Sequence, residues 1–83
     1  MPFTTEILRK HREKVLQDVW IGKPYSSLLE LMGSPKIVME IPGRSHYSSA
    51  RVYGVMDDDS QCIDAFTVIM QADDLIVANY FCR

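Results

Sequence analysis

The chain has little of several features that mark specialised protein classes. Its 83 residues include only four glycines and four prolines, which excludes a collagen-like or linker-like chain. No segment contains eighteen consecutive apolar residues, so no membrane-spanning helix is expected. Nine Lys and Arg stand against eleven Asp and Glu. Since proteins that bind nucleic acid over their whole surface are usually basic, we expect no nucleic-acid partner.

Metal-binding patterns are also missing. The two cysteines, Cys62 and Cys82, belong to no CxxC pair and to no Cys/His cluster with zinc spacing. The acidic residues at 57–59, and Asp73 with Asp74, lack the spaced ligand pattern of a calcium loop. They are predicted to lie in turns at opposite ends of a sheet. We therefore expect neither a metal nor a cofactor.

What the chain does contain is typical of a globular protein. Hydrophobic residues make up 47% and charged residues 24%, and the length predicts one domain over residues 1–83. The first residues lack the basic start and apolar run of a signal peptide, which favours a cytoplasmic location. A periplasmic or outer-membrane-anchored location is the alternative if a signal has been removed.

Helical periodicity is confined to the first part of the chain. Residues 4–20 predict an amphipathic helix whose apolar stripe also includes His11. Its apolar members are Ile7, Leu8, Val15, Leu16, Val19 and Trp20. A second helix is predicted over residues 24–32, with Pro24 in its first turn. Gly33 and Pro35 follow and end it.

After Pro35 the pattern becomes extended. Strands are predicted over residues 36–41, 51–56, 62–70 and 75–82, with residues 44–49 as a polar loop. Short connections between successive strands favour an antiparallel meander. The predicted fold is therefore α+β, with two N-terminal helices packed on a four-stranded antiparallel sheet.

The last predicted hairpin places the two cysteines near each other. If the turn is centred at Ala72, Cys62 lies opposite Cys82, at a separation compatible with a disulfide. The same centring places Phe66 opposite Ala78, and Val68 opposite Ile76. A register half a step away would place Ile63 opposite Cys82 and the thiols on opposite faces. A disulfide and two separate buried thiols both remain open.

One segment resembles a known family. Gly22, Leu28, Leu31, Gly33 and Pro35 form the pattern G-x5-L-x2-L-x-G-x-P, directly before the strands. This pattern resembles the helix signature of the BamE/SmpA superfamily of small outer-membrane lipoproteins, which includes the osmotically inducible lipoprotein E. The resemblance implies a short helix packed on an antiparallel sheet over about residues 15–82. Pro24 stands where the family usually has Ser or Thr, and no lipobox cysteine precedes the domain.

Two groups of residues are candidates for binding. Arg44, His46, Tyr47 and Arg51 form a basic and aromatic group around the longest predicted loop, as recognition surfaces often do. A pocket between the sheet and the helices would use Tyr53, Asp64 or Tyr80 as its polar groups. Asp64 could accept a hydrogen bond from Tyr80. The alternative is that Asp64 simply points outward to solvent.

No arrangement supports catalysis. His11 and His46 are the only histidines, and neither has a local signature that would place it beside a cysteine nucleophile. The basic residues at 9–14 spread around the predicted helix and are diluted by acidic neighbours.

The last two predicted strands are apolar on both faces, which indicates that the second face is also covered, by the N-terminal helix or by another subunit. These patterns predict a non-enzymatic protein-interaction or assembly module that forms homodimers. A small-ligand-binding protein or small enzyme is the alternative.

Overall fold

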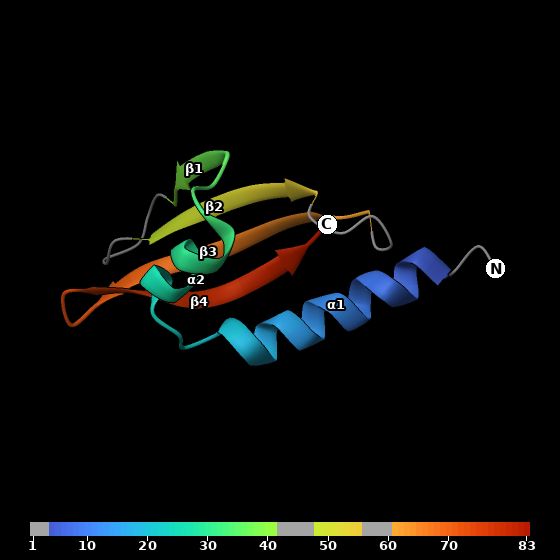
Figure 1. Ribbon diagram of the computed structural model, residues 1–83, viewed down its shortest axis with the longest axis horizontal. Coiled ribbons are helices and arrows are strands. Elements are labelled where there is room, and N and C mark those ends of the chain that lie inside the picture. Colours follow the sequence, from blue (N-terminus) through green and yellow to red (C-terminus); the bar gives the residue numbers. More distant parts are fainter. Residues whose placement is uncertain (1–3, 42–47, 56–60) are drawn as a thin grey trace.

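The predicted α+β arrangement is confirmed by the computed structural model, which describes residues 4–41, 48–55 and 61–83. Two helices precede four strands: α1 (Thr4–Trp20), α2 (Tyr25–Met32), β1 (Ile37–Glu40), β2 (Ser48–Val55), β3 (Ile63–Gln71) and β4 (Asp74–Cys82). The strands form one antiparallel sheet in the order β1-β2-β3-β4 (Figure 1).

The ends of the elements follow local chemistry with small shifts from the prediction. The first helix has the predicted bounds, whereas Pro24 is extended (ψ 139°) and α2 begins one residue later. Gly33 ends α2 with a φ of 76° and donates its N–H to the carbonyl of Leu29 at 2.8 Å. A left-handed φ favours glycine because it has no Cβ. Ser48 and Ser49, predicted as loop, are buried and belong to β2.

Both helices pack against the same face of the sheet. Leu16 and Trp20 of α1 and Met32 of α2 contact one buried cluster. The buried residues of that cluster are Tyr25, Leu28, Tyr53, Cys62, Phe66, Val68, Val77, Tyr80 and Cys82. In Figure 1, α1 runs along β4 and α2 crosses in front of the sheet. The apolar stripe predicted for α1 is wider than the part of the helix that the sheet covers, since Ile7, Val15 and Val19 are exposed. His11, predicted on that stripe, is also exposed.

The opposite face of the sheet carries the alternate residues of each strand. Six residues on this side line an open hollow of about 440 Å³, and we call them the apolar face. They are Met39, Ala50, Val52, Ile63, Ala65 and Phe81. One expected possibility was that the N-terminal helix covers this face. That possibility is wrong, because α1 packs on the side that α2 also covers.

The predicted register of the last hairpin is wrong by one residue next to the turn and by two residues nearer the cysteines. Ala72 and Asp73 both have positive φ (51° and 68°) and form a two-residue turn, which moves the centre of pairing half a residue beyond Ala72. An irregularity between Thr67 and Val68 adds one more residue on β4. Phe66 therefore lies opposite Tyr80, and Asp64 lies opposite Cys82. Beyond that irregularity the total shift is even, so the side chains there keep their predicted faces. Next to the turn the shift is one residue, so Val77 lies opposite Val68 and joins the buried cluster in place of Ile76.

Neither helix has the length and the apolar character needed to cross a bilayer.

Candidate functional site

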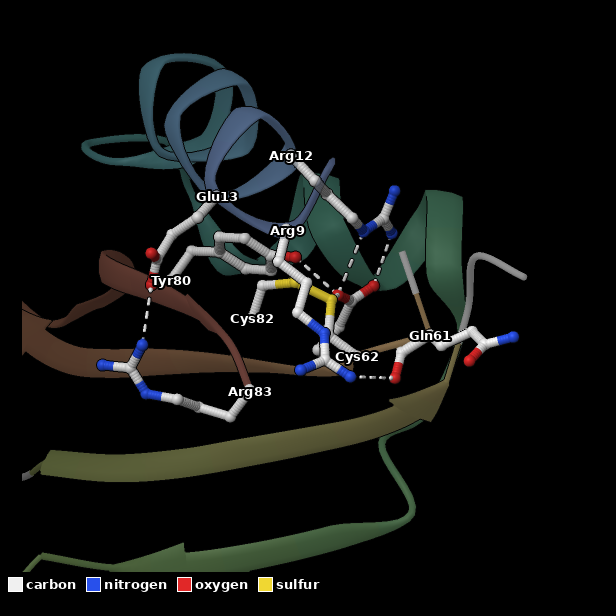
Figure 2. Close-up of a disulfide and its surroundings, with 9 residues drawn as sticks. Arg9, Arg12, Glu13, Gln61, Cys62, Tyr80, Cys82 and Arg83 are labelled. Carbon is white, nitrogen blue, oxygen red and sulfur yellow. Dashed lines mark hydrogen bonds and ion pairs between the residues drawn. A yellow bond between two sulfur atoms is a disulfide. The ribbon is translucent and has the colours of Figure 1, made fainter. Parts of the chain in front are cut away.

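Within the described residues, a cluster of charged and polar side chains lies between α1 and the sheet. Asp64 on β3 is fully buried, and its carboxylate forms an ion pair with the Arg12 guanidinium of α1. The Arg12 Nε donates to Oδ1 at 3.2 Å, and a second guanidinium nitrogen donates to Oδ2. Tyr80 on β4 donates its hydroxyl to Oδ1 (Figure 2). Asp64 therefore points inward, and the outward-facing alternative is wrong.

Strand alternation explains this burial. Asp64 stands two residues after Cys62 and two before Phe66, and all three side chains face the helices. On α1, Arg12 stands one turn from Leu8 and one turn from Leu16, on the side that faces the sheet. A buried carboxylate is tolerated only when it is paired and hydrogen-bonded, which Arg12 and Tyr80 together provide.

The two cysteines form a disulfide in the structure. Cys62 and Cys82 have Cα atoms 5.3 Å apart and link the start of β3 to the end of β4. They are not directly opposed as the predicted register required, because Cys82 lies opposite Asp64. The bridge is diagonal and joins two side chains of the same face. The alternative register, half a step away, is present next to the turn, but the irregularity between Thr67 and Val68 shifts the pairing again, so the two cysteines share one face.

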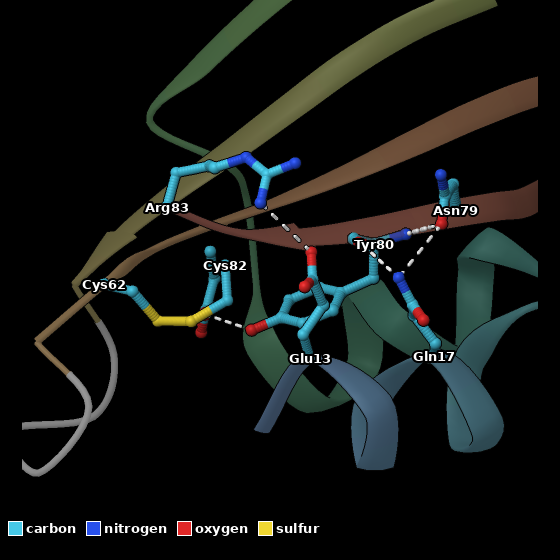
Figure 3. Close-up of polar contacts among 8 residues, drawn as sticks. Glu13, Gln17, Cys62, Asn79, Tyr80, Cys82 and Arg83 are labelled. Carbon is cyan, nitrogen blue, oxygen red and sulfur yellow. Dashed lines mark hydrogen bonds and ion pairs between the residues drawn. A yellow bond between two sulfur atoms is a disulfide. The ribbon is translucent and has the colours of Figure 1, made fainter. Parts of the chain in front are cut away.

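Polar contacts fix α1 along the sheet on both sides of the disulfide. The Gln17 amide donates to the carbonyl of Tyr80 at 3.0 Å, and Glu13 lies 3.6 Å from Arg83 (Figure 3). Arg9 donates to the carbonyl of Gln61 at 3.2 Å (Figure 2). Arg9 and Arg12, which belong to the basic residues at 9–14, thus bind groups of the same chain.

A metal-ligating set is also brought together here. The sulfur atoms of Cys62 and Cys82 and a carboxylate oxygen of Asp64 all lie within 4.8 Å of one another. In the disulfide neither sulfur is a thiolate, the form that binds metals, and Arg12 already holds the carboxylate. The predicted hairpin placed Cys62 near Cys82, but it did not place Asp64 beside them, because the pairing of Asp64 opposite Cys82 depends on the observed register.

The third pocket candidate, Tyr53, belongs to the same buried cluster, but its hydroxyl bonds to groups other than Asp64 and Tyr80. Its hydroxyl donates to the carbonyl of Gly33 at 2.9 Å and lies 3.1 Å from the hydroxyl of Tyr25. The β2 strand has a register shift beside Tyr53, where Gly54 has a φ of 89°. Asp64 and Tyr80 are brought together and Tyr53 is not. No buried side-chain nitrogen or oxygen among the described residues lacks a hydrogen-bond partner.

Of the predicted contact patch, only Arg51 lies within the described residues. Its guanidinium carbon lies 4.5 Å from the centre of the Tyr25 ring, and its Nε donates to the Ser49 hydroxyl at 3.1 Å. Arg51 is half-buried and packs against α2. Arg44, His46 and Tyr47, like the acidic residues at 57–59, lie outside the described residues.

Burial has a consequence for ionisation at high pH. Burial, reinforced by the hydrogen bond to Asp64, raises the pKa of Tyr80, and burial with the Tyr25 contact raises the pKa of Tyr53. A raised folded-state pKa means that stability is complete below the unfolded value of about 10 and is lost as the pH rises above it.

We therefore expect the free energy of unfolding to be flat from pH 8 to about pH 10 as far as these tyrosines contribute, and to fall above that. Urea denaturation at pH 8, 10 and 11, with phenolate absorbance followed in parallel, measures this. Tyr80→Phe should show a shallower fall between pH 10 and 11 than the unaltered chain. Equal slopes for the two proteins would contradict the assignment to Tyr80.

The apolar face is the second candidate site. Ile63 and Met39 protrude from it, with 48% and 52% of their surface exposed. Between them lie the small side chains of Ala50 and Ala65, which create the hollow. Arg83, beside Phe81, is the one charged residue that lines it. Such a surface has the character of a contact surface, since it is apolar and hollowed and has a charge at its edge.

Comparison with protein-family models, with curated proteins and with solved structures gave no match to this chain. The resemblance to the BamE/SmpA superfamily thus stays a prediction that rests on the motif around α2.

Proposed function

We propose that this chain is a non-enzymatic protein-interaction module that self-associates, with the apolar face of one copy packed on the same face of a second copy. The observation that carries the proposal is the apolar face itself. It extends over all four strands, and neither helix lies on it. A sheet normally buries an apolar face against another layer of structure.

The shape of the apolar face suits a second copy. In a two-fold interface each surface meets itself, so protruding groups must match recessed ones. Met39 and Ile63 supply protruding side chains, and Ala50 and Ala65 supply the recess between them. Sheets packed face to face interdigitate side chains in this way. The formal charge of −2 adds little repulsion between copies.

The polar cluster beneath α1 supports a structural role for those residues. A general acid or base must reach a substrate, and Asp64 and Tyr80 are fully buried and bonded to each other. Their hydrogen bonds attach α1 to the sheet.

Light scattering after gel filtration at micromolar concentrations tests the proposal. The unaltered chain should have a mass above the 9.5 kDa of one copy. Ile63→Lys should weaken association at least about tenfold, because a charge would enter the apolar contact. Ile63 is half-exposed, so the variant should fold.

Leu31→Lys is the matched control, because Leu31 is 72% exposed on α2, away from the apolar face. It should associate like the unaltered chain. The proposed function would be refuted if the unaltered chain is monomeric at about 100 µM, near the upper end of the concentrations at which specific assembly is expected. It would also be refuted if the two lysine variants associate equally strongly.

A further inference from the structure

Three buried side chains at one end of the β3–β4 hairpin, those of Cys62, Asp64 and Cys82, form a compact set of potential metal ligands. Strand alternation places Cys62 and Asp64 on the same face of β3, and Cys82 lies opposite Asp64 on β4. While the disulfide is intact, its two sulfur atoms cannot act as thiolate ligands. Reduction changes the chemistry of this set, because it converts one disulfide into two thiols.

We propose that the reduced chain binds one Zn²⁺ between the thiolates of Cys62 and Cys82 and the carboxylate of Asp64. A dithiol reductant supplies two electrons and two protons, so the S–S bond breaks, two thiols form, and the reductant becomes a disulfide. Zn²⁺ then displaces both thiol protons, which pass to solvent. The disulfide and the metal are therefore alternative links between β3 and β4. This inference is independent of the proposed self-association.

The spacing of the donor atoms suits a tetrahedral zinc site. With Zn–S bonds of about 2.3 Å and a Zn–O bond of about 2.1 Å, tetrahedral ligand atoms lie roughly 3.6–3.8 Å apart. The Cys62 sulfur already lies 3.9 Å from Oδ1 of Asp64. The Cα atoms of Cys62 and Cys82 are 5.3 Å apart, so the two sulfurs can reach this spacing by rotation of their side chains once the S–S bond is broken.

The charges of the site balance once the metal is bound. The two positive charges of Zn²⁺ cancel the negative charges of the two thiolates. The remaining negative charge, that of Asp64, is already paired with the Arg12 guanidinium. A buried centre without net charge avoids the large cost of an uncompensated charge away from water. Thiolate ligands also favour zinc over magnesium and calcium, which prefer oxygen ligands.

The hydrogen bonds of Asp64 resemble those around the ligands of known kinds of metal site. Carboxylates that bind a metal are themselves hydrogen-bonded, and these outer contacts orient the ligand oxygens. Arg12 donates to both carboxylate oxygens and Tyr80 donates to Oδ1, so Asp64 is held from α1 and from β4. Neither contact involves a cysteine, so both can hold Asp64 in place after the disulfide is reduced.

An open hollow of about 350 Å³ beside α1 reaches Cys82 and gives the metal a route of entry. Its lining residues are Glu6, Arg9, Lys10, Glu13, Cys82 and Arg83. A site with three protein ligands leaves the fourth zinc position to water, which the hollow can supply. The inference departs from the expectation that the chain binds no metal. Sequence spacing did not indicate the site because Cys82 follows Cys62 by twenty residues.

Cobalt substitution tests the site in the full chain. The chain is reduced with a phosphine, the phosphine is removed by gel filtration without oxygen, and Co²⁺ is titrated in. The reduced chain should bind one Co²⁺ and show thiolate-to-cobalt absorption together with the d–d bands of tetrahedral cobalt. One equivalent of Zn²⁺ should remove these bands. The oxidised chain and the double variant Cys62→Ser/Cys82→Ser should show none of them.

Two aspartate variants separate a carboxylate ligand from a general effect of charge. Asp64→Asn should weaken Co²⁺ binding at least about tenfold. Asp74→Asn is the matched control, because Asp74 is exposed at the other end of the same hairpin. It should bind Co²⁺ like the unaltered chain. The inference is overturned if the reduced chain shows no cobalt bands, if the oxidised chain binds as tightly, or if both aspartate variants bind like the unaltered chain.

X-ray absorption at the zinc edge gives a readout that does not require any variant to fold. The reduced, unaltered chain with one Zn²⁺ should show two sulfur ligands, with oxygen ligands completing the shell. Four sulfur ligands, which would require two chains to share a metal, or oxygen ligands alone would overturn the site. Light scattering of the oxidised, metal-free chain tests self-association separately, so failure of the zinc site and failure of the proposed function are distinguishable.

Discussion

Replacing Asp64 with alanine is expected to lower the free energy of unfolding by about 3 kcal/mol, near the lower end of the range for breaking a buried ion pair. The substitution leaves the Tyr80 hydroxyl buried without its acceptor and removes the anion that faces Arg12. The Arg12 side chain is 23% exposed, so water can partly replace the lost carboxylate, which keeps the effect from being larger. Urea denaturation followed by circular dichroism measures this loss.

A paired apolar replacement separates the ion pair from packing. Arg12→Leu with Asp64→Leu removes both charges at once, and a buried pair replaced in this way is often close to neutral. The double variant should therefore be more stable than Asp64→Ala, although Tyr80 still lacks its acceptor. If Asp64→Ala costs less than about 1 kcal/mol, the carboxylate is not buried as the structure has it.

Loss of the Cys62–Cys82 disulfide is expected to lower the free energy of unfolding by about 3 kcal/mol. The bridge closes a loop with a sequence separation of 20 residues, and closing a loop of that size restricts the unfolded chain by about this amount. In a domain of this size the melting temperature should fall by roughly 12–24 °C. Thermal melts with and without reductant measure the change.

Two further measurements make this result specific. The double variant Cys62→Ser/Cys82→Ser should melt at the temperature of the reduced chain and should not respond to reductant. Alkylation of the unfolded chain without reductant, followed by mass determination, should find no reactive thiol. Full labelling of both cysteines under those conditions would show that the protein carries two thiols.

The substitution of Asp64 and the loss of the disulfide affect neighbouring atoms. Asp64 lies two residues from Cys62 on β3, and the carboxylate oxygen that accepts from Tyr80 lies 3.9 Å from the Cys62 sulfur. Sites in direct contact generally do not give additive free energies. The disulfide variants and Asp64→Ala combined should therefore depart from the sum of the two separate effects.

The boundaries of the elements could be predicted well because they depend on neighbours in sequence. Gly33 and Pro35 end α2, and the change from helical to alternating periodicity marks the start of the sheet. The bounds of α1 agree fully. The largest error at a strand boundary is at Ser48 and Ser49, where polar composition indicated a loop. Ser49 is fully buried, and a single polar side chain on a central strand gives no local sign of that.

The Arg12–Asp64 pair shows where local patterns fail. Two signals were present, an arginine within the sheet-facing side of α1 and an aspartate between the inward-facing Cys62 and Phe66. Either residue taken alone is also consistent with a solvated position. The residues are 52 positions apart, and their pairing depends on how α1 lies across β3 and β4.

The sequence by itself determined the order of the elements and the alternation that gives the sheet two apolar sides. These follow from the periods of helix and strand, which are local properties of the backbone. Only the tertiary structure decided the register of the last hairpin, the pairing of Asp64, and which side of the sheet the helices leave uncovered. Those features depend on a turn of two residues, on one irregular position in β4 and on the direction in which a helix packs, and small energy differences among distant contacts select them.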